Sequence, residues 1–347
     1  MSDDNVVPLH QPIDFTTFTI TESSESMEAK MLEDVYVLGR MAIMGQSTVF
    51  YAAPNAGKTL MTIKLLTERI VAGDVDGTAV FYINADDTYK GLVQKRRICE
   101  EYGFNLLAPG HNGFKPELLA ESLRTRIALD MCNGTVVILD TLKKFTDLMN
   151  KRISSDFGNI IRAFVSNGGT TISLGHVNKH KNEDGLSDYQ GTTDIIDDAD
   201  CAYIIDVLED NGELKTVKFR NIKDRGDVVQ SAMYSYKSKE NRTEMPYSEL
   251  FHSVKEVSPE EAKNAAKRQA IADKLALNHE CILHILSCIN GGVTQKTDLV
   301  KEAADRAGKS QQQIRGVLAA HEGTDRTQGH RWAVAIGGHN AKTYSAL

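Results

Sequence analysis

The sequence has few cysteines and no long apolar run, and each shortage excludes a class of protein. Its five cysteines are odd in number and show no Cys-x-x-Cys spacing, which argues against a disulfide framework and a zinc site. No stretch approaches the ~20 apolar residues of a membrane-spanning helix. The acidic start Asp3-Asp4 does not resemble a signal peptide. We therefore expect a cytoplasmic protein with reduced thiols and no membrane partner.

The composition, 41% hydrophobic and 25% charged, is that of a soluble globular protein. A chain of 347 residues is long enough for one large α/β domain and a small one. Its net charge of −7 is unevenly spread, because residues 1–34 hold eight carboxylates and one lysine, whereas residues 260–347 carry twelve Lys and Arg against nine Asp and Glu. The basic end fits nucleic-acid contact, and a solvated surface accounts for it equally well.

Patterning divides the chain into four parts. Residues 1–30 are acidic, lack periodicity and predict a flexible tail. Strand and helix patterns then alternate through residues 31–240, which predicts a mostly parallel sheet covered by helices. The expected strands are 48–52, 78–84, 135–140, 170–175, 201–207 and 214–220, and the expected helices are 58–72, 88–102 and 116–132. Residues 241–266 are polar, contain two prolines and predict a linker, and residues 267–347 return to helical patterns.

The strand that ends at Ala52 opens into a glycine-lysine-threonine turn and then into a helical pattern. This order predicts a phosphate-binding loop, because the free N–H groups at a helix start favour an anion. Lys58 would reach the β and γ phosphates of ATP, and the Thr59 hydroxyl would ligate Mg²⁺. The usual motif has glycine where this chain has Ala52, and a surface turn that contains Gly-Lys-Thr by chance is the alternative. The expected nucleotide-binding residues are Pro54, Asn55, Ala56, Gly57, Lys58, Thr59 and Leu60.

Two further strands end in carboxylates. Asp140 follows the most apolar strand, at the edge where ligands bind in open α/β sheets. It would hold the magnesium ion through water, or it would cap the following turn. Asp86 and Asp87 follow the strand 78–84, and Asp86 is our candidate for orienting the attacking water. The alternative is that this pair caps the helix that begins near Thr88.

These residues resemble those of the RecA-like ATPases, and among them the branch of plasmid RepA and the DnaB-type hexameric helicases. The resemblance covers roughly residues 32–236. It implies that Asp140 is the Walker B aspartate and that Asp86 stands at the catalytic acid, where the family has the longer glutamate. It also implies that His176, at the end of the strand 170–175, is a sensor of the γ-phosphate. A core or capping histidine is the alternative for His176.

The same resemblance makes Lys223 and Arg225 an arginine-finger pair that completes the nucleotide site of an adjacent subunit. Such a pair stabilises charge on the transferred phosphate and requires a homo-oligomer, which in this family is a hexamer. Two exposed charges on a hairpin are the alternative. The loops after Asp140 and His176 carry Lys143, Lys144, Lys179 and Lys181, which in RecA-like rings face the channel and grip single-stranded DNA; ordinary solvated loops would look the same.

The C-terminal segment predicts three helices, 268–289, 294–307 with Thr294 as N-cap and 310–320, followed by a β-hairpin over 326–336. This order resembles a winged helix. Its expected DNA-contacting residues are Gln312, Arg315 and Arg331. A small protein-docking module is the alternative.

Together these features predict an ATP- and Mg²⁺-dependent DNA helicase or translocase that acts in the replication of a plasmid, phage or mobile element. Two alternatives remain open at this stage. The first is a recombination or repair ATPase of the RecA/RadA kind. The second is a nucleotide-switched DNA-binding regulator or helicase loader.

Overall fold

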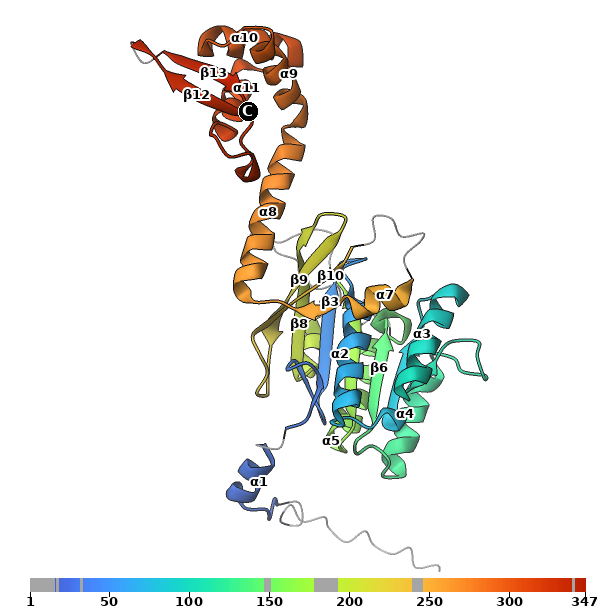
Figure 1. Ribbon diagram of the computed structural model, residues 1–347. Helices are drawn as coiled ribbons and strands as arrows, with labels where there is room; N and C mark the ends of the chain where they lie inside the picture. The colour runs from blue at the N-terminus through green and yellow to red at the C-terminus, as the bar shows by residue number, and fades with distance from the viewer. Residues whose placement is uncertain are drawn as a thin grey trace, which may run out of the picture.

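A single large sheet forms the centre of the computed structural model, which describes residues 16, 19–31, 34–146, 151–177, 193–238, 246–338 and 341–347 (Figure 1). It has nine strands in the order β11-β10-β9-β8-β3-β7-β6-β4-β5. The parallel strands are β3 (Ser47–Ala52), β4 (Val80–Asn84), β5 (Asn105–Leu107), β6 (Val136–Asp140), β7 (Thr170–His176) and β8 (Cys201–Asp210). Antiparallel pairing adds β9 (Leu214–Lys223), β10 (Ser231–Lys237) and β11 (Lys255–Glu256). The chain is therefore an α/β protein with a mostly parallel sheet, as its alternating pattern predicts.

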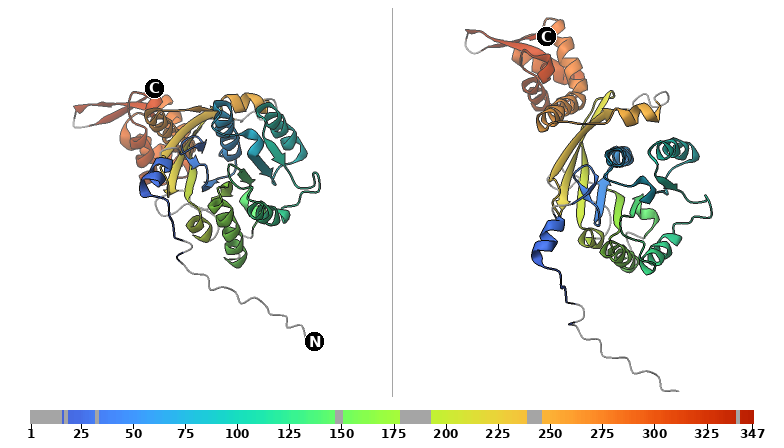
Figure 2. Two further views of the ribbon diagram at one scale, coloured as in Figure 1. Left: turned by 90° about the horizontal axis from the view of Figure 1, so that it is seen from below. Right: turned by 60° about the horizontal axis from the view of Figure 1, so that its bottom comes forward.

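Helices cover both faces of this sheet (Figure 2). One face packs against α2 (Lys58–Ala72), α3 (Tyr89–Tyr102) and α7 (Tyr247–His252), and the other against α4 (Leu118–Ala128), α5 (Lys151–Ser166) and α6 (Thr193–Asp198). Because successive strand side chains point to opposite faces, Tyr82 and Ile138 join the first core, and Ile83 and Leu139 join the second. Burial on both faces explains why the sequence of β6 is apolar almost throughout.

The N-terminal segment contains a helix, α1 (Ser24–Met31), within the region expected to be a flexible tail. The side chains from Ser24 to Glu28 are exposed, and α1 lies apart from the sheet in Figure 1. Residues 1–15, 17 and 18 of the expected tail lie outside the described part of the chain. The short strands β1 (Tyr36–Leu38) and β2 (Ala42–Ile43) then pair with each other and lead into β3.

Residues 246–266 of the expected linker are instead built into the fold, and residues 241–245 lie outside the described part of the chain. The built part contains α7, β11 and the start of α8 (Pro259–Leu277). Leu250 and Phe251 of α7 are buried in the hydrophobic core that also contains the apolar residues of α2. The prolines that suggested a linker stand at helix starts, since Pro246 is the N-cap of α7 and Pro259 the first residue of α8. Proline there fits a helix start as well as it fits a loop.

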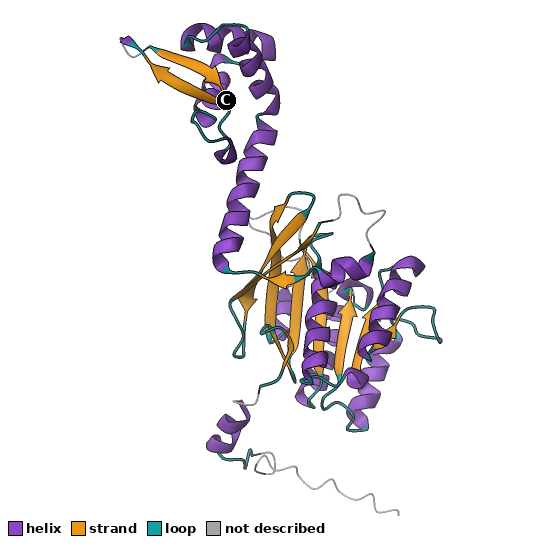
Figure 3. Cartoon of the chain, in the orientation of Figure 1, coloured by secondary structure: helices purple, strands orange, loops and turns teal. Residues whose placement is uncertain are grey.

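The C-terminal residues form a separate small core around Trp332, which is joined to the sheet by α8 (Figure 3). This core is made by α9 (His279–Asn290), α10 (Lys296–Ala307), α11 (Gln311–Ala320) and the hairpin of β12 (Trp332–Ile336) with β13 (Lys342–Ala346). The expected helix over 268–289 is two helices that meet at Asn278, and the N-cap position of α10 is held by Gln295, without a side-chain hydrogen bond, rather than by Thr294.

The hairpin lies later in the chain than expected. Residues Arg326–Gln328 form a 3-10 turn, and the hairpin partner of β12 is β13; before it, Trp332 makes only an isolated parallel bridge with Glu322. The sequence Gly337-Gly338 begins the turn between the two strands, and this glycine pair is the signal that places the hairpin. None of the described helices combines the length and apolar character that a membrane span requires.

Candidate functional site

Four strand ends meet at one edge of the sheet. In the strand registers, Ala52 of β3 pairs with His176 of β7, Asp140 of β6 pairs with Leu174, and Asn84 of β4 pairs with Asp140. Since parallel strands share their carboxyl edge, the loops that follow β3, β7, β6 and β4 surround one site. The residues expected to bind nucleotide come from these loops.

The loop between β3 and α2 takes its shape from two residues with left-handed backbone. Asn55 has φ 63° and Gly57 has φ 81°, a conformation that asparagine and glycine tolerate best. Ala52 lies inside β3, so the position where the motif usually has glycine needs no special backbone here. A Cβ at Gly57 would collide with the Tyr236 hydroxyl of β10, so glycine is required there for packing as well.

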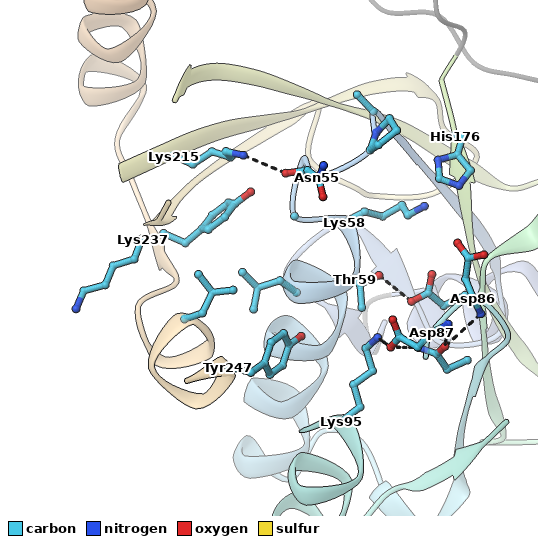
Figure 4. A pocket seen from close by; sticks show the side chains of 18 residues that line it. Asn55, Lys58, Thr59, Asp86, Asp87, Lys95, His176, Lys215, Lys237 and Tyr247 are labelled. Carbon is cyan, nitrogen blue, oxygen red and sulfur yellow. Dashed lines mark hydrogen bonds and ion pairs between the residues drawn. The ribbon is translucent and has the colours of Figure 1, made fainter. Parts of the chain in front are cut away.

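Lys58 begins α2, and its side chain turns into the site (Figure 4). Its Nζ donates a 3.2 Å hydrogen bond to the Gly175 carbonyl on β7. Burial lowers the pKa of the Lys58 ammonium, and the charges of Asp140 and Asp86 oppose that shift. Lys58 therefore supplies a partly buried positive charge to the cavity, next to the carboxylates of Asp140 and Asp86.

Thr59 and Asp140, the two expected magnesium ligands, lie in direct contact. Thr59 Oγ1 donates a 2.7 Å hydrogen bond to Asp140 Oδ2. Both are oxygen ligands of the kind that Mg²⁺ prefers. Among the described residues no group of three or more His, Cys, Asp or Glu side chains forms a metal site. A magnesium ion beside Thr59 and Asp140 would therefore take its other ligands from phosphate and water, as Mg²⁺ commonly does in nucleotide sites.

Asp86 and Asp87 follow β4 but differ in surroundings. Asp87 forms an ion pair with the buried Lys95 of α3 and accepts a 3.1 Å hydrogen bond from Asn84 Nδ2. Asp86 is partly exposed, with Lys144 at 3.8 Å, and Figure 4 shows its carboxylate on the side of His176. Asp87 is therefore held in place by structure, and Asp86 faces the site. Neither side chain caps α3, whose N-cap residue is Thr88.

His176 ends β7 and is half-buried at the edge of the site. Its Nε2 is buried and has no hydrogen-bond partner in the described part of the chain. Burial, followed by the positive charges of Lys58 and Lys143, lowers the pKa of the His176 imidazole. Both effects favour the neutral ring, and its Nε2 is enclosed without a partner among the described residues.

These residues line a cavity of about 380 Å³ whose other wall was not foreseen from the sequence. That wall comes from β9, β10 and α7, and comprises Lys215, Tyr236, Lys237, Tyr247 and Leu250. Lys215 Nζ donates a 3.1 Å hydrogen bond to the Asn55 carbonyl of the loop. The helical spacing of Tyr247, Leu250 and Phe251 was the signal that could have revealed α7.

Lys223 and Arg225 lie at the opposite edge of the sheet from the cavity. In the strand registers Lys223 pairs with Ala202, and Ala202 pairs with Val49, three residues before the end of β3. Lys223 therefore lies toward the amino end of β3, away from the cavity at its carboxyl end. The Lys223 ammonium donates 2.6 Å hydrogen bonds to the carbonyls of Ile196 and Asp197, and Arg225 donates to Asp197 at 3.2 Å. Neither side chain belongs to the cavity lining of its own chain.

The residues expected to bind nucleic acid fall into two groups. Lys143 and Lys144 are exposed on the 3-10 turn Leu142–Lys144 that follows β6, next to the cavity. Lys179 and Lys181 lie outside the described residues. In the C-terminal unit, Gln312 and Arg315 are exposed on α11, and Arg331 is half-buried, with its guanidinium donating to the carbonyls of Arg326 and His330.

A scan against protein-family models finds no match for this chain, and a search of curated proteins finds none either. The functional argument therefore depends on the chemistry of the site.

Proposed function

We propose that this chain is a magnesium-dependent ATPase with a RecA-like core, that it works in the cytoplasm as a ring, and that it moves along DNA as the RepA and DnaB-type helicases do. The observation that carries the proposal is the 2.7 Å hydrogen bond between Thr59 Oγ1 and Asp140 Oδ2. It joins the two expected magnesium ligands beside the Lys58 ammonium, in one cavity at the carboxyl edge of a parallel sheet.

The loop and the start of α2 would bind the triphosphate of ATP. Backbone N–H groups at the start of this 15-residue helix face the cavity without a side-chain cap, and the helix dipole adds partial positive charge. Lys58 supplies a full charge next to them. Thr59 and Asp140 would hold Mg²⁺, which when bound neutralises charge on the β- and γ-phosphate oxygens.

Hydrolysis needs a base or orienting group for water on the far side of the γ-phosphorus. Both aspartates line the cavity, and Asp86 suits this role because Asp87 is held by its ion pair with the buried Lys95. Water attacks the γ-phosphorus and gives a proton to Asp86, the bond from the γ-phosphorus to the bridging oxygen breaks, and ADP and phosphate result. His176 lines the same cavity and would contact the γ-phosphate there.

The ring is proposed from the position of Lys223 and Arg225. Because they lie at the sheet edge opposite the cavity, they serve hydrolysis only in the site of a neighbouring subunit. An arginine supplied in this way stabilises charge on the transferred phosphoryl group. Arg225 is itself exposed: its hydrogen bond to the Asp197 carbonyl lies at the surface, and its 3.9 Å contact is with the buried Asp200, which also pairs with Arg162.

DNA is proposed as the substrate along which the ring moves. Lys143 and Lys144 are exposed beside the cavity, where binding of a phosphate backbone would act on the ATPase site through Asp86. The order of α9, α10, α11 and the β12–β13 hairpin supports a winged-helix-like unit, with Gln312 and Arg315 exposed on the helix before the hairpin.

The test is ATP hydrolysis and strand displacement by the full chain, with and without single-stranded DNA. We expect hydrolysis that requires Mg²⁺ and rises with DNA, and its loss in Lys58→Ala. Lys64→Ala is the matched control, because Lys64 lies on the same helix and pairs with Glu68 outside the cavity. DNA-stimulated hydrolysis without strand displacement would favour a recombinase or loader. No hydrolysis and no ATP binding by the wild type would overturn the proposal.

A further inference from the structure

The buried hydroxyl of Tyr82 makes an unforeseen contact with Asp140. Tyr82 lies in the middle of β4, its side chain is fully buried, and its hydroxyl donates a 2.5 Å hydrogen bond to Asp140 Oδ2. The same oxygen accepts the hydrogen bond from Thr59 Oγ1. Two neutral donors from two different elements therefore fix one oxygen of this carboxylate.

The second oxygen of Asp140 is left for other ligands. Within the described part of the chain, both side-chain hydrogen bonds to this carboxylate end on Oδ2. A carboxylate held by one oxygen cannot turn about its terminal torsion without breaking both bonds, so the direction of Oδ1 is set before any ligand arrives. Outer partners of this kind orient metal-binding carboxylates and strengthen metal binding.

Asn84 extends this contact to the turn that carries Asp86. Asn84 Nδ2 lies 3.4 Å from the Tyr82 hydroxyl, and Asn84 Oδ1 accepts hydrogen bonds from the backbone N–H groups of Asp86 at 3.3 Å and Asp87 at 3.0 Å. Asn84 is itself buried at 2% exposure. Through Tyr82 and Asn84, the carboxylate of Asp140 and the backbone of Asp86 therefore belong to one chain of hydrogen bonds.

We propose that Tyr82 is a positioning residue, which holds the Asp140 carboxylate ready for magnesium and, through Asn84, sets its place relative to Asp86. This inference rests on the proposed function. Tyr82 would contact neither nucleotide nor metal in this role, because it is not part of the cavity lining. Its hydroxyl hydrogen is donated to Asp140. Its effect is exerted through the angle at which Asp140 meets the ion.

The experiment measures the Mg²⁺ concentration at half-maximal binding of a fluorescent ATP analogue by wild type and Tyr82→Phe, and the affinity of each for the analogue in EDTA. We expect Tyr82→Phe to need about 10-fold more Mg²⁺, the effect typical of losing an outer partner of a metal ligand, with unchanged affinity in EDTA. Unchanged EDTA affinity also reports that the loop is folded.

Tyr203→Phe is the matched control. Tyr203 is equally buried in β8 of the same sheet and donates one 2.7 Å hydrogen bond to the Val229 carbonyl, outside the cavity. We expect its Mg²⁺ requirement to equal that of the wild type. Asn84→Ala serves as a second variant should Tyr82→Phe not fold, with about a 3-fold rise in the Mg²⁺ requirement expected from the weaker 3.4 Å contact.

Equal Mg²⁺ requirements in wild type, Tyr82→Phe and Tyr203→Phe would overturn the inference and leave the proposed function standing. Equal increases in Tyr82→Phe and Tyr203→Phe would also overturn it, because they would reflect a general loss of stability. Binding of the analogue that is indifferent to Mg²⁺ in the wild type would instead overturn the proposed function, and the inference with it.

Discussion

Lys95 of α3 and Asp87 after β4 form an ion pair beside the cavity, and this pair assigns different roles to two adjacent aspartates. The Lys95 side chain is 8% exposed and Asp87 is 30% exposed. An ammonium so enclosed needs its counter-charge. Asp86, one residue earlier, also lines the cavity, and its ion pair is with the exposed Lys144 at 3.8 Å, so it balances no buried charge.

We expect Asp86→Asn to lower ATP hydrolysis by about 10²–10⁴-fold, the usual contribution of a general base. ATP binding should persist, because the loop and Lys58 are untouched. Steady-state hydrolysis and equilibrium binding of a fluorescent ATP analogue check the two halves of this prediction. Hydrolysis at the wild-type rate would remove Asp86 from the mechanism.

We expect Asp87→Asn to lower the free energy of unfolding by about 1–3 kcal/mol, less than for a fully buried pair because Asp87 is partly exposed. Urea denaturation of the full chain measures it. The control is Glu68→Gln, which breaks the more exposed pair between Lys64 and Glu68 on α2 and should cost less than ~1 kcal/mol. Equal costs in the two variants would show that Lys95 does not depend on Asp87.

A mixing experiment tests the sharing of the site between subunits. Arg225→Ala should lose at least about 10³-fold in hydrolysis, whereas Arg220→Ala, which removes a pair with Asp206 from the strand that also carries Lys223, should stay near wild type. Inactive Arg225→Ala mixed with inactive Lys58→Ala should regain activity, because one supplies the loop and the other the finger. A mixture with no more activity than its parts would contradict a shared site.

The C-terminal unit should lose stability in acid because of His321. Its Nδ1 donates to the Gly329 carbonyl at 2.8 Å, so Nε2 is left to accept from Asn278 at 3.1 Å, and both contacts suit the neutral ring. Burial lowers the pKa of His321 from its ordinary 6.5. His321 therefore binds a proton more tightly in the unfolded chain than in the folded unit. As a result, the free energy of unfolding falls as the pH drops below about 6.5.

Fluorescence of Trp332 measures this effect, because it is the single tryptophan of the chain and its ring lies 6.2 Å from the His321 ring. Urea transitions between pH 7.5 and 5.5 should move to lower urea as the pH falls, and His321→Gln should flatten that dependence. His279→Gln, an exposed histidine of the same unit, is the control. A slope that survives in His321→Gln would assign the effect to other groups.

DNA binding by the C-terminal unit has its own test in the full chain. Arg315 is exposed on α11, and its guanidinium contacts only Gln311 at 3.3 Å among the described residues. Arg315→Ala should weaken duplex binding and reduce the salt slope by about one. The control is Arg306→Ala on α10, where the guanidinium is engaged by Glu302 and Ser287. Identical salt slopes in both variants would argue for a protein-docking role.

The sequence was sufficient for the elements that follow one local rule. The helix Lys58–Ala72 was predicted at both ends, because a glycine-lysine-threonine turn begins it and Gly73, with φ 82°, ends it. The ends of β4, β6 and β7 were located because apolar runs stop at polar residues there. The contact of Thr59 with Asp140 follows from these ends and from the parallel order of the strands.

Two other contacts between distant segments could not be predicted from the sequence. The wall formed by Tyr236 and Tyr247 depends on how β10 and α7 fold back over the loop, and no spacing in the sequence encodes that return. The role of Tyr82 was hidden for another reason. A tyrosine in a β-strand is common, and only the register between β4 and β6 reveals that its hydroxyl meets Asp140.

The helix α8 joins the C-terminal unit to the sheet, and a series of contacts leads from α8 to the loop between β3 and α2. Arg268 of α8 donates two 2.6 Å hydrogen bonds to Glu209 of β8. The next residue, Asp210, forms an ion pair with Lys215, and Lys215 also donates a hydrogen bond to the Asn55 carbonyl. From Arg268 to the end of α8 the helix extends about 14 Å at ~1.5 Å per residue, so a tilt of about 20° would carry the attached unit by about 5 Å. A small displacement of the loop between β3 and α2 would therefore reach the C-terminal unit enlarged by the length of α8.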